Sequence, residues 1–309
     1  MPERRLLLVG QIGLSAGLLV YLFLKADPAQ AAATVFNGDP LLLAIAVFQL
    51  GVQIPLVAWR WSLITASLGS AMPFGVALRY SWIGTFAGQI LPSIGGDAVR
   101  MWLFWTRYAS RRIAVYGVML ERLVMVVALL ALVIFLQSGL DARGVPVVVT
   151  GTAALLLVCI AAATGALVFF GKGLLKERGF LPVRALRHAA ADTRRLLADV
   201  PRTSLVFALS FASYLNMGIV MWMIGLGLNL GVSLADCMVL TPLIVLAAML
   251  PISLGGWGVR EGAAILLFGL AGLTRSDALA LSVVFGLCTA IITLPGSVLW
   301  LAQKRARIS

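Results

Sequence analysis

The chain has 309 residues, of which 61% are hydrophobic and only 12% are charged. A water-soluble domain of this length could not hide so much apolar surface, so the composition indicates an integral membrane protein. The net charge of +12 would suggest a nucleic acid partner in a soluble protein, but basic residues also gather in cytoplasmic loops of membrane proteins, and we expect no nucleic acid partner.

The chain begins with a short basic lead, Pro2 to Arg5, followed by the apolar run Leu6–Leu24. This run is long enough to cross a bilayer, which needs roughly 20 residues. A cleaved signal peptide is the alternative, because Ala29-Gln30-Ala31 resembles a cleavage site, but the apolar run is longer than a signal core. We therefore predict a first membrane helix with its amino terminus in the cytoplasm.

Five further apolar runs are long enough to span the membrane. We predict six full spans in total, namely Leu6–Leu24, Leu41–Ser67, Ile113–Gln137, Val145–Gly171, Thr203–Leu228 and Ala278–Gln303. In the second span, Trp59 and Trp61 flank Arg60 as an interfacial aromatic belt would, so we expect Arg60 at the cytoplasmic surface. The three cysteines, Cys159, Cys237 and Cys288, lie in apolar runs without paired spacing, and they predict neither a disulfide nor a metal site.

Two other apolar regions are interrupted by proline and paired glycines. Phe74–Leu91 and Ala98–Trp105 are separated by one such break, and Cys237–Leu250 and Glu261–Leu273 by the other. Proline and glycine interrupt helices, and the arms after the breaks are too short to cross a bilayer alone. We therefore predict two re-entrant hairpins of broken helices.

The residues at the two breaks are similar to each other. Leu91 to Arg100 aligns with the stretch from Leu250 to Glu261 at an offset of 160 residues, and five of eight compared positions are identical: Ser93, Gly95, Gly96, Val99 and Arg100 match Ser253, Gly255, Gly256, Val259 and Arg260. Paired interruptions in two halves are typical of a transporter binding site. We predict one polytopic membrane domain over 1–309, with residues 41–140 and 201–300 as inverted repeats.

A basic loop covers 172–202 and carries eight lysines and arginines. Within it, apolar and polar residues alternate with helical spacing: Val183, Leu186, Ala190, Leu197 and Val200 share one side, and Arg184, His188, Asp192, Arg195 and Asp199 the other. This pattern fits an amphipathic helix bound to anionic lipids of the inner leaflet, and it fits a solvated linker equally well. His188 is the only histidine, and we expect it to be an ordinary surface residue.

The distribution of basic residues predicts the orientation. With the loop 172–202 inside, 17 basic residues, Arg60 among them, fall on the cytoplasmic side and three, Lys25, Arg143 and Arg275, fall outside. This asymmetry favours cytoplasmic amino and carboxyl termini under the positive-inside rule. It also makes the first hairpin enter from the cytoplasm and the second from outside.

Seven charged residues are left at membrane depth: Arg79, Asp97, Arg100, Glu121, Arg122, Arg260 and Glu261. A charge at the bilayer centre costs about 2.5–3.5 kcal/mol on insertion scales, so such residues pair with one another or line a polar path. Structural salt bridges are therefore one interpretation. The other is a binding site in which Arg100 and Arg260, beside the glycine breaks Gly95-Gly96 and Gly255-Gly256, bind a phosphate-like head group at two helix starts.

Three blocks of the sequence carry a family resemblance: Gly96-Asp97-Ala98-Val99-Arg100, Glu121-Arg122-Leu123, and Leu250-Pro251 through Gly255-Gly256-Trp257-Gly258-Val259-Arg260-Glu261. They resemble the signature blocks of the lysylphosphatidylglycerol synthase transmembrane family, also called flippase-like domain proteins, over roughly Leu6 to Gln303. The resemblance implies movement of a lipid across the bacterial inner membrane. Candidate lipids among relatives are aminoacylated phosphatidylglycerol, polyprenyl phosphates and hopanoids. The printed chain contains no soluble synthase domain, so we do not expect it to charge a lipid with an amino acid.

We therefore expect a lipid flippase without a cofactor, and it could form a homo-oligomer. Arg100 and Arg260 would bind the head group, and Glu261, Asp97, Glu121, Arg122 and Arg79 would line the path. Two alternatives are an intramembrane enzyme that modifies lipids, with Asp97 and Glu261 as acid and base, and a scaffold for a lipid-synthesis complex.

Overall fold

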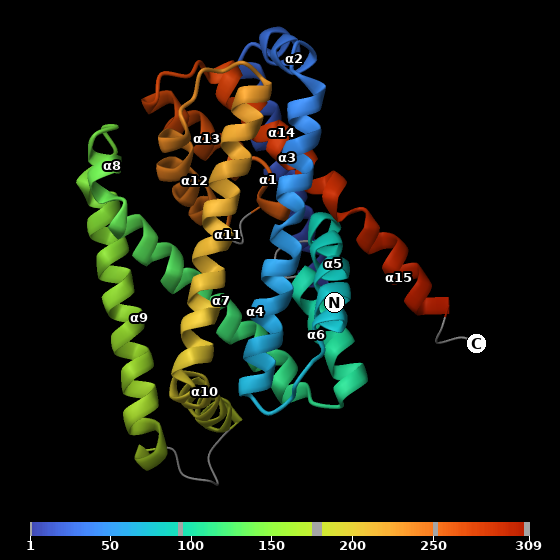
Figure 1. The fold of residues 1–309 in the computed structure, drawn as a ribbon, viewed down its shortest axis with the longest axis vertical. Coiled ribbons are helices and arrows are strands. Elements are labelled where there is room, and N and C mark those ends of the chain that lie inside the picture. Colours follow the sequence, from blue (N-terminus) through green and yellow to red (C-terminus); the bar gives the residue numbers. More distant parts are fainter. Residues whose placement is uncertain (1, 92–94, 175–180, 250–252, 306–309) are drawn as a thin grey trace.

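The computed structural model describes residues 2–91, 95–174, 181–249 and 253–305, and every regular element in these ranges is helical. This confirms the prediction of an all-α membrane protein (Figure 1). The elements are α1 (Pro2–Lys25), α2 (Pro28–Phe36), α3 (Pro40–Gly51), α4 (Gln53–Ser67), α5 (Phe74–Ile90), α6 (Gly95–Tyr108), α7 (Arg111–Phe135), α8 (Gln137–Asp141), α9 (Val147–Leu174), α10 (Leu181–Ala198), α11 (Val200–Gly227), α12 (Leu234–Ala248), the 3-10 turn η1 (Leu254–Gly256), α13 (Val259–Leu270), α14 (Arg275–Thr293) and α15 (Pro295–Arg305).

Five helical stretches among the described residues are long and apolar enough to cross a membrane: Pro40–Ser67, Arg111–Phe135, Val147–Phe169, Val200–Gly227 and Arg275–Gln303. They coincide with five of the six predicted spans. The remaining predicted span, 6–24, lies in α1, whose part Ser15–Lys25 is an apolar helix.

The connection after α1 contains a short helix, α2, that we did not predict. Two Asp-Pro pairs start the helices here: the side chain of Asp27 accepts hydrogen bonds at the start of α2, and that of Asp39 does so at the start of α3. Aspartate before a proline at the first helical position is a strong start signal. The carboxylate accepts hydrogen bonds from free backbone N–H groups of the first turn, and proline has no N–H that would need a partner. The predicted second span is divided at Val52, three residues before Pro55, which cannot donate the hydrogen bond of a continuous helix.

The two interrupted regions form two pairs of short helices, α5 with α6 and α12 with α13. The proline residues Pro92 and Pro251 of the predicted breaks, with Ser93 and Ile94, lie outside the described residues. Figure 1 shows α5 and α6 in the lower half of the molecule and α12 and α13 in the upper half. The pairs approach each other where η1 packs against α5, since a Cβ added at Gly255 would lie 3.7 Å from the carbonyl oxygen of Gly88.

Each pair of short helices has its own apolar core. One core joins α5 and α6 to α4 and the start of α7, with Trp61, Ile83 and Phe104 fully buried. The other joins α12, α13 and α14 to α3 and the outer part of α11. The long helices α7 and α11 contribute to both cores and so connect the two halves of the molecule.

The amphipathic region of the basic loop forms a helix, α10, in agreement with the interpretation of this region as an amphipathic helix. It crosses the lower end of the bundle beside α4, α7, α9 and α11. We expected Asp192 on the polar, exposed side, and this was wrong: the side chain is fully buried and accepts a hydrogen bond of 3.0 Å from Arg112 on α7. Burial raises the pKa of the Asp192 carboxyl, and the charges of Arg112 and Arg195 act in the opposite direction.

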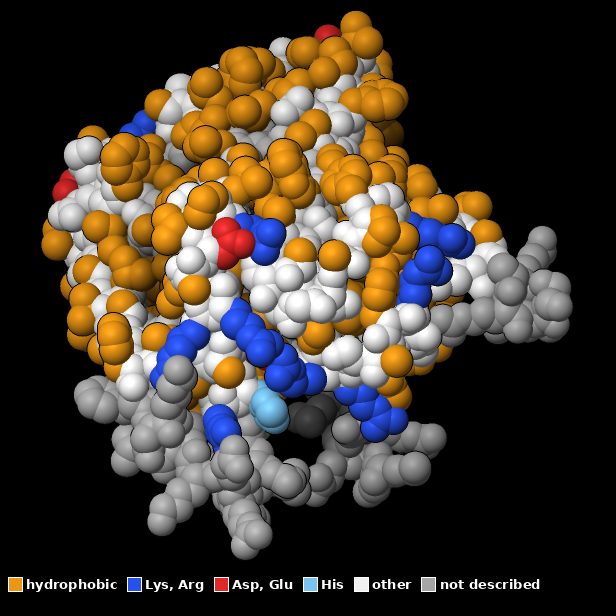
Figure 2. Space-filling view, turned by 60° about the horizontal axis from the view of Figure 1, so that its bottom comes forward, with side chains coloured by type: hydrophobic (Ala, Val, Ile, Leu, Met, Phe, Trp, Pro, Cys, Tyr) orange, Lys and Arg blue, Asp and Glu red, His pale blue; other side chains and the backbone are white. Residues whose placement is uncertain are grey.

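The surface has two kinds of region. Figure 2 shows apolar side chains over the flanks of the molecule and lysine and arginine side chains gathered toward the lower end, where α10 lies. An apolar flank with a basic end is the arrangement expected of a helical protein in a bilayer with one basic face in water.

Candidate functional site

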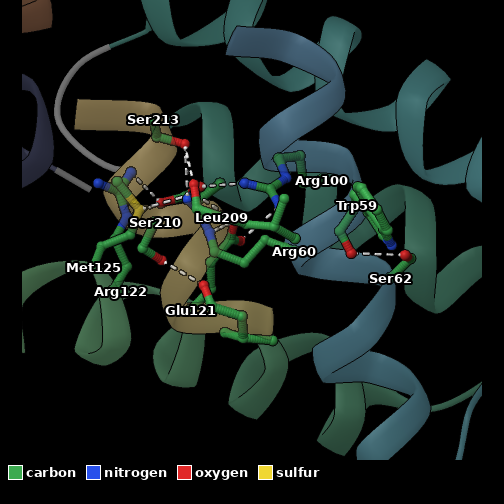
Figure 3. Close-up of polar contacts among 12 residues, drawn as sticks. Trp59, Arg60, Ser62, Arg100, Glu121, Arg122, Met125, Leu209, Ser210 and Ser213 are labelled. Atoms are coloured by element: carbon green, nitrogen blue, oxygen red, sulfur yellow. Dashed lines mark hydrogen bonds and ion pairs between the residues drawn. The ribbon is translucent and has the colours of Figure 1, made fainter. Parts of the chain in front are cut away.

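Five charged side chains from three helices meet in one cluster, and Figure 3 labels four of them, Arg60, Arg100, Glu121 and Arg122. We call them the first charged cluster: Arg60 from α4, Asp97 and Arg100 from α6, and Glu121 and Arg122 from α7. Four of the five were predicted as charges at membrane depth. The structure adds Arg60, which we expected at the cytoplasmic surface and which is instead fully buried.

Glu121 is the centre of the first charged cluster. Its Oε1 accepts hydrogen bonds from Nε and Nη2 of Arg60, at 3.3 and 3.1 Å, and its Oε2 accepts one from Arg100 at 2.7 Å. Arg60 also donates to Oγ of Ser213 on α11 at 3.3 Å. One carboxylate therefore joins α4, α6 and α7, and its charge is shared by two buried cations.

Asp97 occupies the edge of the cluster. Its Oδ1 lies 3.4 Å from Nη1 of Arg100. Its Oδ2 accepts a hydrogen bond of 2.7 Å from Nε of Arg122 and lies 2.5 Å from Nη2 of the same side chain as an ion pair. Asp97 lies in the first turn of α6, where a negative charge is also favoured by the helix dipole. Arg122 differs from the rest of the cluster because 48% of its side chain is exposed.

The position of Arg100 depends on two neighbours without charge. Its guanidinium lies over the ring of Trp61, 4.3 Å from the centroid, and its aliphatic part crosses α5 at Gly84, where any Cβ would clash with it. The Nε of Arg100 and the indole nitrogen of Trp61 are buried and have no hydrogen-bond partner among the described protein atoms. Buried donors of this kind are usually satisfied by bound water or a ligand.

The first charged cluster has an excess of positive charge. Three arginines face two carboxylates, and four of the five side chains are almost completely buried. An unbalanced charge in a low-dielectric region is costly, so the cluster favours an additional anion. Arg122 is its most exposed member and is the side chain that such an anion could reach from outside.

A second charged cluster lies at the start of α13 and is smaller. Glu261 is completely buried; its Oε1 lies 2.5 Å from Nη2 of Arg260, and its Oε2 accepts a hydrogen bond of 2.6 Å from the backbone N–H of Gly258. The hydroxyl of Ser282 on α14 contacts both side chains at 3.3 Å. We expected the start of this helix to offer N–H groups to a ligand, but Glu261 already occupies one of them.

The two aligned arginines, Arg100 and Arg260, have similar neighbours in their clusters. Arg260 lies over Trp257, 4.5 Å from the ring centroid, as Arg100 lies over Trp61. A Cβ at Gly286 of α14 would clash with Arg260, as one at Gly84 would with Arg100. Among the described residues, no hydrogen bond or ion pair joins the two clusters. The hypothesis that Arg100 and Arg260 line one pocket therefore stays a prediction.

The other predicted site residues have structural positions of different kinds. Arg79 on α5 is half-buried, and its Nε has no hydrogen-bond partner among the described atoms. Gly96 packs on α5, where a Cβ would clash with the backbone of Gly84, and a Cβ at Gly95 would clash with Leu91. Gly255 and Gly256 have φ angles of 57° and 81°, which favour glycine. The described residues hold no group of three His, Cys, Asp or Glu side chains suited to a metal ion.

The fold and these clusters define a polytopic helical membrane protein with buried ionic clusters at two pairs of short helices. The family model described as "Lysylphosphatidylglycerol synthase TM region" matches residues 8–296, and the chain belongs to this family. No curated protein matches the chain. The match confirms the resemblance of the sequence blocks and covers both clusters.

Proposed function

We propose that the chain is a lipid flippase that moves a phospholipid or a phosphate-bearing lipid, polyprenyl or aminoacylated, across the bacterial inner membrane. The observation that carries this proposal is the first charged cluster. Four of its side chains are buried, it has excess positive charge, and the side chain of Arg122 is partly exposed. A phosphate carries the anionic charge that the cluster lacks. Arginine is the usual partner of phosphate because its planar group can donate two parallel hydrogen bonds.

The arrangement of the carboxylates favours transport over catalysis. Both oxygens of Asp97 contact arginines, and Glu261 is bound by Arg260, Ser282 and a backbone N–H. A general base needs an oxygen that can reach a substrate proton, and carboxylates held in this way are poor bases. We therefore propose that the protein is not an enzyme.

Helix boundaries support the inverted repeat. α4 ends at Ser67 and α11 at Gly227, and the following helices start at Phe74 and Leu234, so both boundaries recur after 160 residues. This is the offset at which the sequence repeats. The two pairs of short helices lie in opposite halves of the molecule, as re-entrant hairpins from opposite membrane faces would. Rocking of such repeats about a central site is a common route to alternating access.

We place the basic end, with α10, in the cytoplasm. The basic residues gathered there support this orientation. Lys25 ends α1, Arg143 follows α8 and Arg275 begins α14, and these ends lie away from α10. Both termini would then be cytoplasmic.

Replacing Arg122 by Ala should slow lipid movement more strongly than it lowers stability, because its side chain is the exposed edge of the cluster and Asp97 keeps its contact with Arg100. Hydrogen bonds to charged groups contribute about 1.5–3 kcal/mol, so we expect transport to fall roughly tenfold or more. The measurement is dithionite quenching of head-group-labelled lipids in liposomes that contain the protein. Arg122→Lys, which keeps the charge and loses the paired donors, should retain part of the rate.

The matched control for Arg122→Ala is Arg275→Ala, which removes an exposed arginine outside both clusters and should leave transport unchanged. Full transport by Arg122→Ala would remove this residue from the path. If the unsubstituted protein moves no phospholipid and no polyprenyl phosphate, with or without a proton gradient, the enzyme and scaffold hypotheses would replace the flippase.

A further inference from the structure

The apolar face of α10 extends beyond the bundle that covers its middle. Leu186 and Leu197 are eleven residues apart, close to three helical turns, so they share a face with Ala190. Ala190 is buried, whereas Leu186 and Leu197 are 49% and 46% exposed. This face of α10 therefore carries a partly exposed leucine on either side of the buried Ala190.

The accessible charges on α10 are of one sign. Arg195 and His188 are exposed, and Arg187 and Arg194 are partly exposed. The one acidic residue of the helix, Asp192, is buried and lies 3.0 Å from Arg112 and 3.6 Å from Arg195. Figure 2 shows the resulting concentration of basic side chains around the histidine. Because no carboxylate of α10 reaches the surface, this helix presents only cationic groups to a partner.

Polar contacts hold α10 to α7 and also fix the residues that follow its carboxyl end. The Arg112–Asp192 pair fixes it to α7. At its carboxyl end Asp199 lies 2.8 Å from Arg202, whose guanidinium is also 3.5 Å from the hydroxyl of Ser67 on α4. The Arg112–Asp192 pair and the burial of Ala190 together restrict rotation of α10 about its own axis.

We propose that α10 is a membrane-surface helix that binds anionic phospholipid head groups. Uncovered leucines on the face toward the bundle would enter the head-group boundary, and arginines beside them would reach the phosphates while their aliphatic parts cover apolar surface. Arg187 directly follows Leu186, and Arg194 lies one turn before Leu197, so both flank the apolar face. An acidic soluble protein would match the charge but would leave Leu186 and Leu197 in water.

The test uses the full chain in lipid nanodiscs and does not depend on transport. Cys159 is exposed and the other two cysteines are buried, so Cys159→Ser gives a background for labelling. A fluorescent label at Leu197→Cys is compared with one at His188→Cys, which lies on the opposite face of α10. Quenching by a water-soluble and by a lipid-soluble quencher is measured in phosphatidylcholine alone and with increasing phosphatidylglycerol.

The proposal predicts that the label at position 197 becomes shielded from the water-soluble quencher and open to the lipid-soluble one as phosphatidylglycerol is added, while the label at position 188 stays in water. Adding Arg187→Gln and Arg194→Gln should raise the required phosphatidylglycerol fraction, about fivefold for each arginine at low salt. Equal water access at positions 197 and 188 would overturn the membrane contact. Shielding that is complete in phosphatidylcholine alone would overturn the preference for anionic lipid.

Discussion

Replacing Glu121 by Gln should destabilise the fold strongly and abolish lipid movement. Glu121 is the shared partner of Arg60 and Arg100, and all three side chains are buried. The amide can still accept a hydrogen bond but carries no charge, so two cations would remain close together with less compensation. Removal of one partner from a buried pair costs about 3–5 kcal/mol, and we expect a loss of this order in thermal unfolding of the detergent-solubilised protein.

Two further variants separate this effect from a general sensitivity to substitution. Asp141→Asn removes an exposed carboxylate at the end of α8 and should change stability by no more than about 0.5 kcal/mol. Glu121→Gln combined with Arg60→Met removes one of the orphaned charges and should recover part of the lost stability, because an uncharged side chain of similar length replaces it. Wild-type stability of Glu121→Gln alone would contradict the ionic organisation of the cluster.

Replacing Gly84 by Ala should displace Arg100 and stop transport. A methyl group at position 84 would overlap the aliphatic part of Arg100, which is fixed between Trp61 and Glu121. Overpacking of this kind costs about 1–3 kcal/mol, and the guanidinium can move only by giving up its carboxylate or its ring contact. Gly286→Ala should have the corresponding effect on Arg260. Unfolding and liposome transport assays measure both consequences.

Two glycines with free space around them serve as controls for these substitutions. Gly75 on α5 and Gly269 on α13 have nothing within 4 Å of an added Cβ, so alanine at either position should be neutral or stabilising by up to about 1 kcal/mol. Gly84→Ala with normal stability and transport would show that Arg100 has another equally good position.

Much of the fold could be predicted because membrane helices have a simple signal. Apolar runs of sufficient length located five of the candidate spans, and proline with paired glycine located the two interrupted regions. The short helix α2 was missed because nine residues give little periodicity, although the Asp27-Pro28 start signal was present. Asp192 was misplaced because helical spacing separates faces but does not tell which flank another helix will cover.

The charged residues of the site could be predicted individually but not their partners. Intramembrane charge selected Asp97, Arg100, Glu121 and Arg122, yet pairing is a property of tertiary packing. Arg60 was not predicted as a site residue because its flanking tryptophans suggested a position at the membrane interface. In the structure it lies two turns inside the end of α4, and Trp61 is buried with it. The depth of a charge within its helix was the better signal here, because a buried charge at that depth requires a partner.

The glycines at the contact between α5 and α6 limit how these two helices can move relative to each other. Gly84 and Gly96 allow the backbones of the two helices to approach closely, and the side chain of Arg100 lies across α5 at this point. Sliding of α5 along α6 would therefore displace Arg100. If this pair moves during the proposed transport, we expect α5 and α6 to move together as one unit. The backbone would then bend at Gly69, with φ of 95°, and at Ala109, with φ of 53°, where the pair joins α4 and α7.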